Sequence, residues 1–236
     1  MNVAKKSGSG LSYGDAEYNA GGSGLLGSRA HDDIKEWERF FGVEYKGWDD
    51  YDHDNSYGAF SDWYETATPE EREAARTYTG SAYTTINDYL RSDKLSDAPQ
   101  WVKDAVRNND KASAKFYLPE AITVWRGGSD KLIGGAKTVE QINAMKGAIV
   151  VDRGITSTAV TKDASWINES NMGYEIVYPK GRGRGIFIDP ISKNHGEQEF
   201  MASRKTSYEV IGGYTDAEGH VICQLKAVYG RKARKK

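Results

Sequence analysis

The chain predicts an α+β fold in which helices come first and short, mostly antiparallel strands follow. Up to about residue 117, apolar residues recur at helical spacing. After Pro119 they alternate with polar ones, in short runs rich in Val, Ile, Thr and Tyr that turn residues separate. Helices grouped before strands are typical of an α+β domain rather than of alternating βαβ units. Since no internal repeat or composition shift divides residues 31–230, we expect one domain there.

Composition excludes several classes of protein. The net charge of -2 gives no overall attraction to nucleic acid or anionic lipid. No apolar run approaches the roughly 18 residues of a membrane span, and the first ten residues lack the apolar centre of a signal peptide. Cys223 is the single cysteine, so we expect a buried, unreactive thiol and no intrachain disulfide. We therefore expect a cytoplasmic protein, in the producing cell or in an invaded one, with no membrane partner.

The two ends of the chain differ from its centre. Residues 1–30 are rich in Gly and Ser without periodicity, which predicts a flexible segment. Their glycines are not followed by the Gly-Lys-Ser/Thr of a phosphate-binding loop. Residues 231–236 form a basic tail, for which a solvated end and an electrostatic contact to nucleic acid are both open.

The helical half has a well-marked internal start. Thr68 is suited to be an N-cap, with Pro69 in the first turn and Glu71 closing a capping box. Farther along the same helix, Asn87 and Arg91 lie one turn apart on one face. The helices predicted in this half cover residues 32–41, 57–66, 68–92, 98–107 and 111–117.

The acidic stretch at residues 49–55 could attract a hard cation. It lacks the glycine and the terminal glutamate of a calcium loop, so we expect a solvated loop and no metal site. In the second half, brief helices are predicted near 139–145 and 161–169. The predicted strands cover residues 122–127, 148–158, 174–178, 185–188, 197–203, 208–214 and 220–229.

The Glu197-Gln198-Glu199 segment is the main candidate for chemistry. Residues i and i+2 of a strand point to the same face about 6.5 to 7 Å apart, so the two glutamates are predicted to project into one cleft. Taken alone, such a pair is more often a solvated strand edge than a site.

Three motifs in order carry a resemblance to a known family. Arg126, then Ser157-Thr158-Ala159, then Glu197-Gln198-Glu199 resemble the Arg, Ser-Thr-Ser and Glu-x-Glu motifs of the mono-ADP-ribosyltransferases, in the branch of bacterial exoenzyme toxins and phage-encoded enzymes. Residues 83–91 resemble the family's helix that ends in a phosphate-contacting arginine. Residues 178–181 with 185–188 resemble its loop over the nicotinamide end.

The resemblance covers residues 68–228, with a looser helical part from 31, and it departs from the family at two positions. Ala159 replaces the third residue of Ser-Thr-Ser, and Ile155 replaces the usual aromatic residue before that motif. The fold implied is an ADP-ribosyltransferase-like one, with N-terminal helices and then two packed, mostly antiparallel sheets flanking an NAD cleft. The reaction implied is transfer of ADP-ribose from NAD to an arginine of a target protein, with release of nicotinamide.

The resemblance implies distinct roles for the two glutamates. Cleavage of the nicotinamide–ribose bond develops positive charge on the ribose, which an anion stabilises more in the transition state than in the ground state. Glu199 is the candidate for that anion, and Ser157 would hold it by a hydrogen bond. Glu197 would orient and help deprotonate the nucleophile. In the family a glutamate at this position accompanies arginine as acceptor.

Further residues are implied to bind NAD. Arg126 would grip the pyrophosphate, since a planar guanidinium binds phosphate oxygens in a bidentate fashion. Gly127 would let the backbone approach the nicotinamide amide closely. Arg91 would assist at a phosphate with Asn87 nearby, and Phe187 would pack on the nicotinamide ring.

Other interpretations stay open at this stage. Arg91 could complement a helix dipole, Phe187 could be plain core, and His195 could shape the loop that meets a target. A catalytically silent NAD- or partner-binding module of the same fold would account for Ala159 and Ile155. A nucleic-acid-associated acceptor is suggested by the basic tail, with NAD and a monomeric enzyme otherwise expected.

Overall fold

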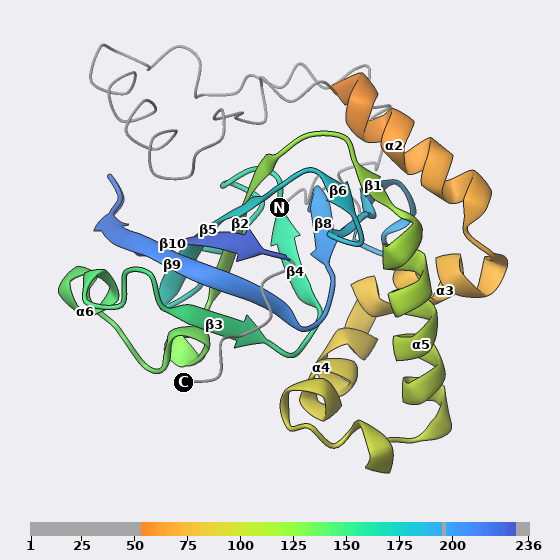
Figure 1. Cartoon of the computed structure of the whole chain (residues 1–236), viewed down its shortest axis with the longest axis horizontal. Coiled ribbons are helices and arrows are strands. Elements are labelled where there is room, and N and C mark those ends of the chain that lie inside the picture. Colours follow the sequence, from red (N-terminus) through yellow and green to blue (C-terminus); the bar gives the residue numbers. More distant parts are fainter. Residues whose placement is uncertain (1–52, 195–196, 230–236) are drawn as a thin grey trace, which may run out of the picture.

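A computed structural model describes residues 53–194 and 197–229 (Figure 1). Helices lead and strands follow, which confirms the predicted α+β class. The flexible segment predicted over 1–30, the helix over 32–41, most of the acidic stretch, His195 and the basic tail lie outside the described residues.

From residue 53 on, where the structure describes the chain, the helical half contains four α-helices joined by short turns. They are α2 (His53–Thr66), α3 (Pro69–Thr77), the π-helical turn η1 (Tyr78–Ala82), α4 (Tyr83–Arg91), the 3-10 turn η2 (Leu95–Asp97) and α5 (Gln100–Lys115). The other half contains β1 (Tyr117–Leu118), β2 (Ile122–Gly128), η3 (Asp130–Ile133), α6 (Val139–Asn143), β3 (Ile149–Asp152), β4 (Thr156–Ala159), β5 (Met172–Tyr178), β6 (Gly181–Arg182), β7 (Gly185–Phe187), η4 (Asp189–Ile191), β8 (Glu199–Ala202), β9 (Thr206–Thr215) and β10 (Val221–Val228).

Eight strands form a mixed sheet in the order β3-β9-β10-β5-β2-β4-β8-β7, beside a two-stranded β1-β6 sheet. Only β10 and β5 run parallel among these pairs, so the expected antiparallel character is confirmed. Between β2 and β4 the ladder is reduced to the single pair Trp125↔Ala159. The eight strands therefore behave as a five-stranded and a three-stranded unit that separate at this junction.

The helices α2 to α5 lie on the side of the three-stranded unit, and α6 lies beside β9 (Figure 1). One continuous core joins both halves, from Trp63 and Ile86 in the helices to Phe200 and Leu225 in the strands. Because this core anchors α4 against the strands, residues of both halves meet where β2 and β4 separate.

The predicted capping box is confirmed. The Thr68 side chain accepts from the Glu71 N–H at 3.3 Å, and the Thr68 N–H donates to Glu71 Oε2 at 2.9 Å. The helix predicted over 68–92 is interrupted at Gly80, whose φ of -98° and ψ of -158° are not helical. There the Lys193 N–H donates to Thr79 Oγ1 and the Asn194 amide donates to Thr79 O, both at 2.9 Å. The interruption thus docks the helices on the chain that leads to Glu197.

Several predicted boundaries were wrong. The helix predicted over 57–66 already begins at His53, and the helices predicted over 98–107 and 111–117 are the single helix α5. The strand predicted over 148–158 is two strands, β3 and β4, because the chain turns at Gly154. The helix predicted over 161–169 is absent, since this stretch forms turns in which Trp166 has a left-handed φ of 60°.

Two expectations from composition have structural counterparts. Cys223 is fully buried, and burial raises the pKa of its thiol to about 12. Within residues 53–194 and 197–229, no helix has both the length and the apolar character that crossing a bilayer requires.

Candidate active site

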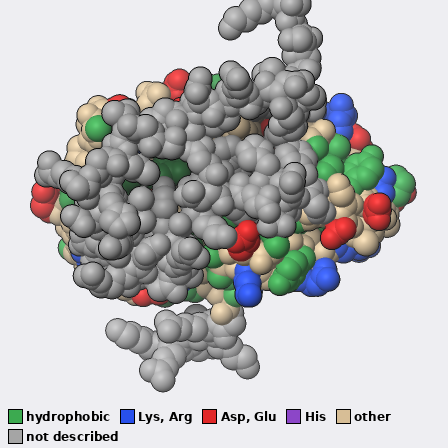
Figure 2. Space-filling view, turned by 90° about the horizontal axis from the view of Figure 1, so that it is seen from above, with side chains coloured by type: hydrophobic (Ala, Val, Ile, Leu, Met, Phe, Trp, Pro, Cys, Tyr) green, Lys and Arg blue, Asp and Glu red, His purple; other side chains and the backbone are tan. Residues whose placement is uncertain are grey.

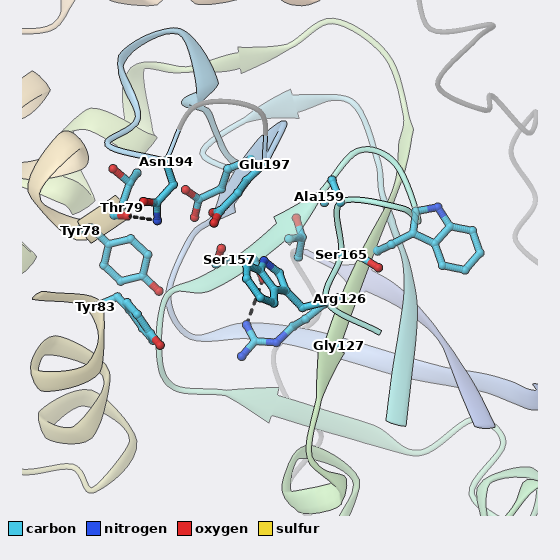
Figure 3. A pocket seen from close by; sticks show the side chains of 15 residues that line it. Tyr78, Thr79, Tyr83, Arg126, Gly127, Ser157, Ala159, Ser165, Asn194 and Glu197 are labelled. Atoms are coloured by element: carbon cyan, nitrogen blue, oxygen red, sulfur yellow. Dashed lines mark hydrogen bonds between the residues drawn. The ribbon is translucent and has the colours of Figure 1, made fainter. Parts of the chain in front are cut away.

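A cavity of about 370 Å³ opens where β2 and β4 separate (Figure 3). The helical half contributes two tyrosines, seen at one side of the close-up, and the strands contribute the central groups. The residues that line this cavity include Tyr78, Tyr83, Trp125, Arg126, Gly127, Ser157, Ala159, Ser165, Trp166, Asn194, Glu197 and Glu199. The structure thus brings together the three predicted motifs from β2, β4 and the start of β8.

Glu199 opens β8 and is almost completely buried, with 3% of its surface exposed. The Ser157 hydroxyl on the neighbouring strand β4 hydrogen-bonds its carboxylate. Burial raises the pKa of Glu199 to about 7, against the lowering effect of Ser157. The carboxylates of Glu197 and Asp189 raise it further, and Arg126 lowers it. A carboxyl group poised near neutral pH in a cavity is a candidate for chemistry.

Glu197 lines the same cavity but does not belong to the strand, which corrects the prediction of two glutamates on one strand face. The reason is Gln198, whose φ of 48° is left-handed. For a residue with a side chain, this conformation costs about 1–2 kcal/mol. Burial raises the pKa of Glu197, which Asn194 lowers through a hydrogen bond and Asp189 raises through its charge.

Arg126 connects this cavity to another one. Its Nη1 donates to Ser157 O at 3.1 Å, and its side chain lines both spaces. The neighbouring cavity measures about 520 Å³ and is also lined by Arg91, Lys131 and Arg153. Four cationic side chains around one cavity suit a ligand that carries phosphate groups.

Gly127 has a packing reason to be glycine. Its N–H donates to Ser165 O at 2.6 Å. A Cβ at this position would lie 2.1 Å from Trp166 O, so any side chain would collide with the backbone of that loop. The loop that contains Ala164, Ser165 and Trp166 therefore forms one wall of the cavity against β2.

Arg91 and Asn87 hold the turn that leads into β4. Arg91 donates to both oxygens of Asp152, at 3.0 and 2.9 Å. The Asn87 amide accepts from the Ile155 N–H at 2.9 Å and donates to Ile155 O at 3.0 Å. Asn87 is 4% exposed and lines neither cavity described above, whereas Arg91 faces the second one.

The structure places the remaining predicted residue elsewhere. Phe187 is 4% exposed within the core, paired with Phe200 at the edge of the three-stranded unit, and it does not line the cavity. Residues 178–181, predicted as the loop over the nicotinamide end, do not line it either; residues 164–166 do. Sequence reasoning missed this loop because its polar residues were interpreted as a helix.

Sequence reasoning also missed aromatic residues and one acid. Tyr78, Tyr83, Trp125 and Trp166 line the cavity, and Trp166 is 60% exposed. In the sequence, the positions of these aromatic residues indicate only that they pack in the core. Asp189 is 1% exposed, and its charge raises the pKa of both Glu197 and Glu199. Its only sequence signal is an acid in the turn that precedes the pair.

Comparison with known proteins agrees with this geometry. The family model described as ADP-ribosyltransferase exoenzyme matches residues 54–229, which include every element of both cavities. The chain belongs to the ADP-ribosyltransferase exoenzyme family. A curated relative, the NAD(+)--arginine ADP-ribosyltransferase EFV of Enterococcus faecalis, is 26% identical over 153 residues. That match covers 63% of this chain and 30% of the relative, so the chain spans under a third of that protein's length.

Solved structures share the fold of this exoenzyme-family chain. Plx2a, an ADP-ribosyltransferase toxin from Paenibacillus larvae, has a TM-score of 0.66 at 22% identity, covering 85% of this chain and 97% of that one. The C3 exoenzyme of Clostridium limosum has a TM-score of 0.68 at 19% identity, covering 80% and 100%. C3stau2 from S. aureus, solved with NAD, has a TM-score of 0.66 at 19% identity, with the same coverage.

Proposed function

We propose that this protein transfers ADP-ribose from NAD to an arginine side chain of a target protein and releases nicotinamide. The observation that carries the proposal is the buried Glu199, hydrogen-bonded by Ser157 and accompanied by Glu197 in one cavity. Family membership supports NAD as the substrate, and the name of the Enterococcus faecalis relative supports arginine as the acceptor.

The chemistry follows from the charges that develop. When the bond between the ribose C1′ and the nicotinamide nitrogen breaks, its electron pair leaves with nicotinamide and the ribose gains positive charge. In our proposal the ionised Glu199 stabilises that charge, since an anion placed beforehand in a buried site needs little reorganisation. Ser157 keeps the carboxylate directed into the cavity, as the hydrogen bond between them indicates.

Glu197 is assigned to the second half of the reaction. A guanidinium nitrogen of the acceptor forms the new bond to C1′ and must lose a proton. A carboxylate with a raised pKa is a better base than an ordinary one, and burial raises the pKa of Glu197. We propose that Glu197 binds the acceptor guanidinium and takes this proton.

In our proposal each of the two cavities binds a different part of NAD. We propose that Arg126 and Arg91 bind the pyrophosphate, because both line the second cavity and Arg126 also lines the first. Arg91 uses one N–H of Nε and one of Nη2 on Asp152, so its Nη1 hydrogens and the second Nη2 hydrogen are left for a phosphate. Asn87 is better assigned to holding the turn at Ile155 than to NAD itself.

The Gly127 N–H can bind the nicotinamide amide only through a change of partner. Its N–H is donated to Ser165 O, so binding the amide there requires the loop at 164–166 to release that hydrogen bond. We do not assign Phe187 to the ring, since it lies in the core. Trp166 and Trp125 are the aromatic side chains available at this end.

The alternatives have less support. Ala159 lines the cavity and pairs with Glu199 across the strands, and Ile155 contributes its backbone to Asn87. Both departures leave Glu199, Ser157 and Arg126 in place at the cavity. On the described part of the face in Figure 2, acidic and basic side chains are interspersed, which does not favour a nucleic-acid partner. We propose that the enzyme acts as a monomer.

The experiment that tests the proposal uses small acceptors. The purified protein is incubated with labelled NAD and either agmatine, which carries a guanidinium, or a simple alkylamine of similar length. We expect nicotinamide release to rise with agmatine only, and the labelled product to be cleaved by neutral hydroxylamine. Labelling that prefers the amine, or no cleavage of NAD with any acceptor, would contradict the proposal.

A further inference from the structure

Gln198, the residue between the two glutamates, is held from three directions. Its N–H donates to Asp189 Oδ1 at 2.9 Å, and its carbonyl accepts from the Val160 N–H at 3.1 Å. Its side-chain Oε1 accepts from the Thr161 hydroxyl at 2.8 Å. These partners come from η4 and from the chain just after β4, so the left-handed backbone at Gln198 is imposed by its surroundings.

Asp189 is the only ionisable side chain among these three partners. It is 1% exposed and begins the short turn η4, which follows the strand β7 after one intervening residue. Ile188, the residue before it, donates its N–H to Glu199 O at 3.0 Å. The strand edge and the Asp189 carboxylate therefore grip consecutive residues of the same segment.

We propose that Asp189 is a positioning residue for the two glutamates. By accepting the Gln198 N–H, it keeps the backbone in the turn that directs both Glu197 and Glu199 into one cavity. A regular strand would also put both on one face, but it would remove the bend that brings Glu197 next to Asn194. The effect on activity rests on the proposed function, whereas the backbone restraint does not.

The charge of Asp189 gives a second, separable consequence. Its carboxylate raises the pKa of both glutamates, after the larger effect of burial. An uncharged residue of the same shape would leave the hydrogen bond and remove this repulsion. Among the described residues, the ionisable groups that face Glu199 from the elements around it are Glu197 before β8, Asp189 in η4, Arg126 in β2 and Tyr78 in η1.

Two substitutions separate these consequences. Asp189→Asn keeps an oxygen acceptor for the Gln198 N–H, and Asp189→Ala removes it. Asp97→Asn and Asp97→Ala, at an exposed position in η2, serve as matched controls. Hydrogen exchange of the Gln198 amide, followed by NMR, reports the restraint without any need for activity. Amides of the central strand β10 report whether each variant is folded.

We expect Gln198 exchange to stay slow in the wild type and in Asp189→Asn, and to become at least tenfold faster in Asp189→Ala while β10 stays protected. Unchanged exchange in a folded Asp189→Ala would overturn the proposal. If that variant does not fold, the decision passes to exchange in Asp189→Asn, where loss of protection would be the overturning result.

The pH profile of NAD cleavage is the second test. We expect Asp189→Asn to keep the plateau rate within about threefold and to move the acid limb to lower pH. Asp189→Ala should lower the rate by about tenfold to a hundredfold, as loss of a hydrogen bond to a charged group does. An unshifted limb in Asp189→Asn would contradict the charge effect. Wild-type protein that does not cleave NAD would instead refute the proposed function and leave the exchange result standing.

Discussion

The acidic residues at the cavity, Glu197 and Glu199, and those at the β9–β10 turn, Asp216 and Glu218, lie in opposite electrostatic environments. At the turn, Asp216 and Glu218 each lie 2.9 Å from Lys162 Nζ. Burial by itself raises the pKa of Asp216, but hydrogen bonds from Lys162 and His220 outweigh it and lower this pKa to about 2. At the cavity, burial and neighbouring carboxylates raise the pKa of Glu199 to about 7.

The difference teaches that a cluster of acids is not a site by virtue of its composition. Asp216, Glu218 and His220 are close enough to share a cation, yet a lysine ammonium already lies between the two carboxylates. No lysine is among the described residues that line the cavity, where Arg126 is the cation that lowers the pKa of Glu199. Charge left uncompensated near a ligand space can stabilise a developing positive charge, whereas compensated charge stabilises structure.

Removing one carboxylate from each group should give the largest contrast. We expect Glu199→Gln to lower kcat for NAD cleavage by at least about a hundredfold, because it removes the charge that stabilises the ribose in the transition state. Asp216→Asn should leave kcat within about twofold of the wild type. Comparable losses in the two variants would contradict the assignment. Steady-state nicotinamide release measures both.

The pH dependence should reflect the cavity acids alone. Because the ionised form of Glu199 is the active one, kcat/KM should rise with pH and level off above about pH 7. Well below that value it should fall about tenfold for each pH unit. Asp216 should not contribute between pH 5 and 9, since its pKa is lowered to about 2. A flat profile from pH 5 to 8 would count against the raised pKa.

Glu199 and Asp216 should change the unfolding free energy in opposite directions as the pH rises. Glu199 has a folded-state pKa of about 7 against an ordinary 4.5, so the folded state holds a proton that the unfolded state has lost between these values. Unfolding free energy should therefore decrease as pH rises through this window, by up to about 3 kcal/mol. Glu199→Gln should then be more stable than the wild type at pH 8, with the gain vanishing below pH 4.5.

Asp216 provides the opposite case for the same urea titrations. Its folded-state pKa is lowered from 3.8 to about 2, so its contribution is present above pH 3.8 and is lost as pH falls through 2. Asp216→Asn should destabilise the protein at pH 8, by about 1 kcal/mol for a partly exposed ion pair. Destabilisation by both substitutions at pH 8 would remove the distinction between the groups.

The smallest expected effect concerns the link between the turn and the cavity. Lys162 belongs to the same loop as Ser165 and Trp166, so its ion pairs anchor the wall of the cavity to the β9–β10 turn. We expect Lys162→Met to raise KM for NAD by up to about fivefold with kcat unchanged, which matches the energy of a partly exposed ion pair. Lys146→Met, away from the cavity, is the control. A fall in kcat alone would assign Lys162 a different role.

Much of the fold and of the site was predictable, for identifiable reasons. The helix start at Thr68 depends on local hydrogen bonds, and the strand β2 on local alternation, so neighbouring residues suffice to predict them. The order of Arg126, Ser157 and the two glutamates carried a family resemblance, and the structure gathers these residues in one cavity.

What escaped prediction depends on contacts between distant parts of the chain. The left-handed Gln198 is held by Asp189 and Thr161, and the interruption at Gly80 by contacts between Thr79 and the chain at 193–194. The turn residues at 161–169 have helix-like composition, but their loop is shaped by β2 through Gly127. Such contacts leave no periodic pattern in the sequence.

The most direct test of the account compares Glu197→Gln with Glu199→Gln on two readouts, NAD cleavage by water and transfer to agmatine. We predict that Glu199→Gln loses both, whereas Glu197→Gln retains cleavage within about threefold and loses transfer by about a hundredfold, since only the acceptor's proton depends on Glu197. If Glu199→Gln retained cleavage, or if Glu197→Gln lost cleavage and transfer to the same extent, the division of labour between the two glutamates would be contradicted.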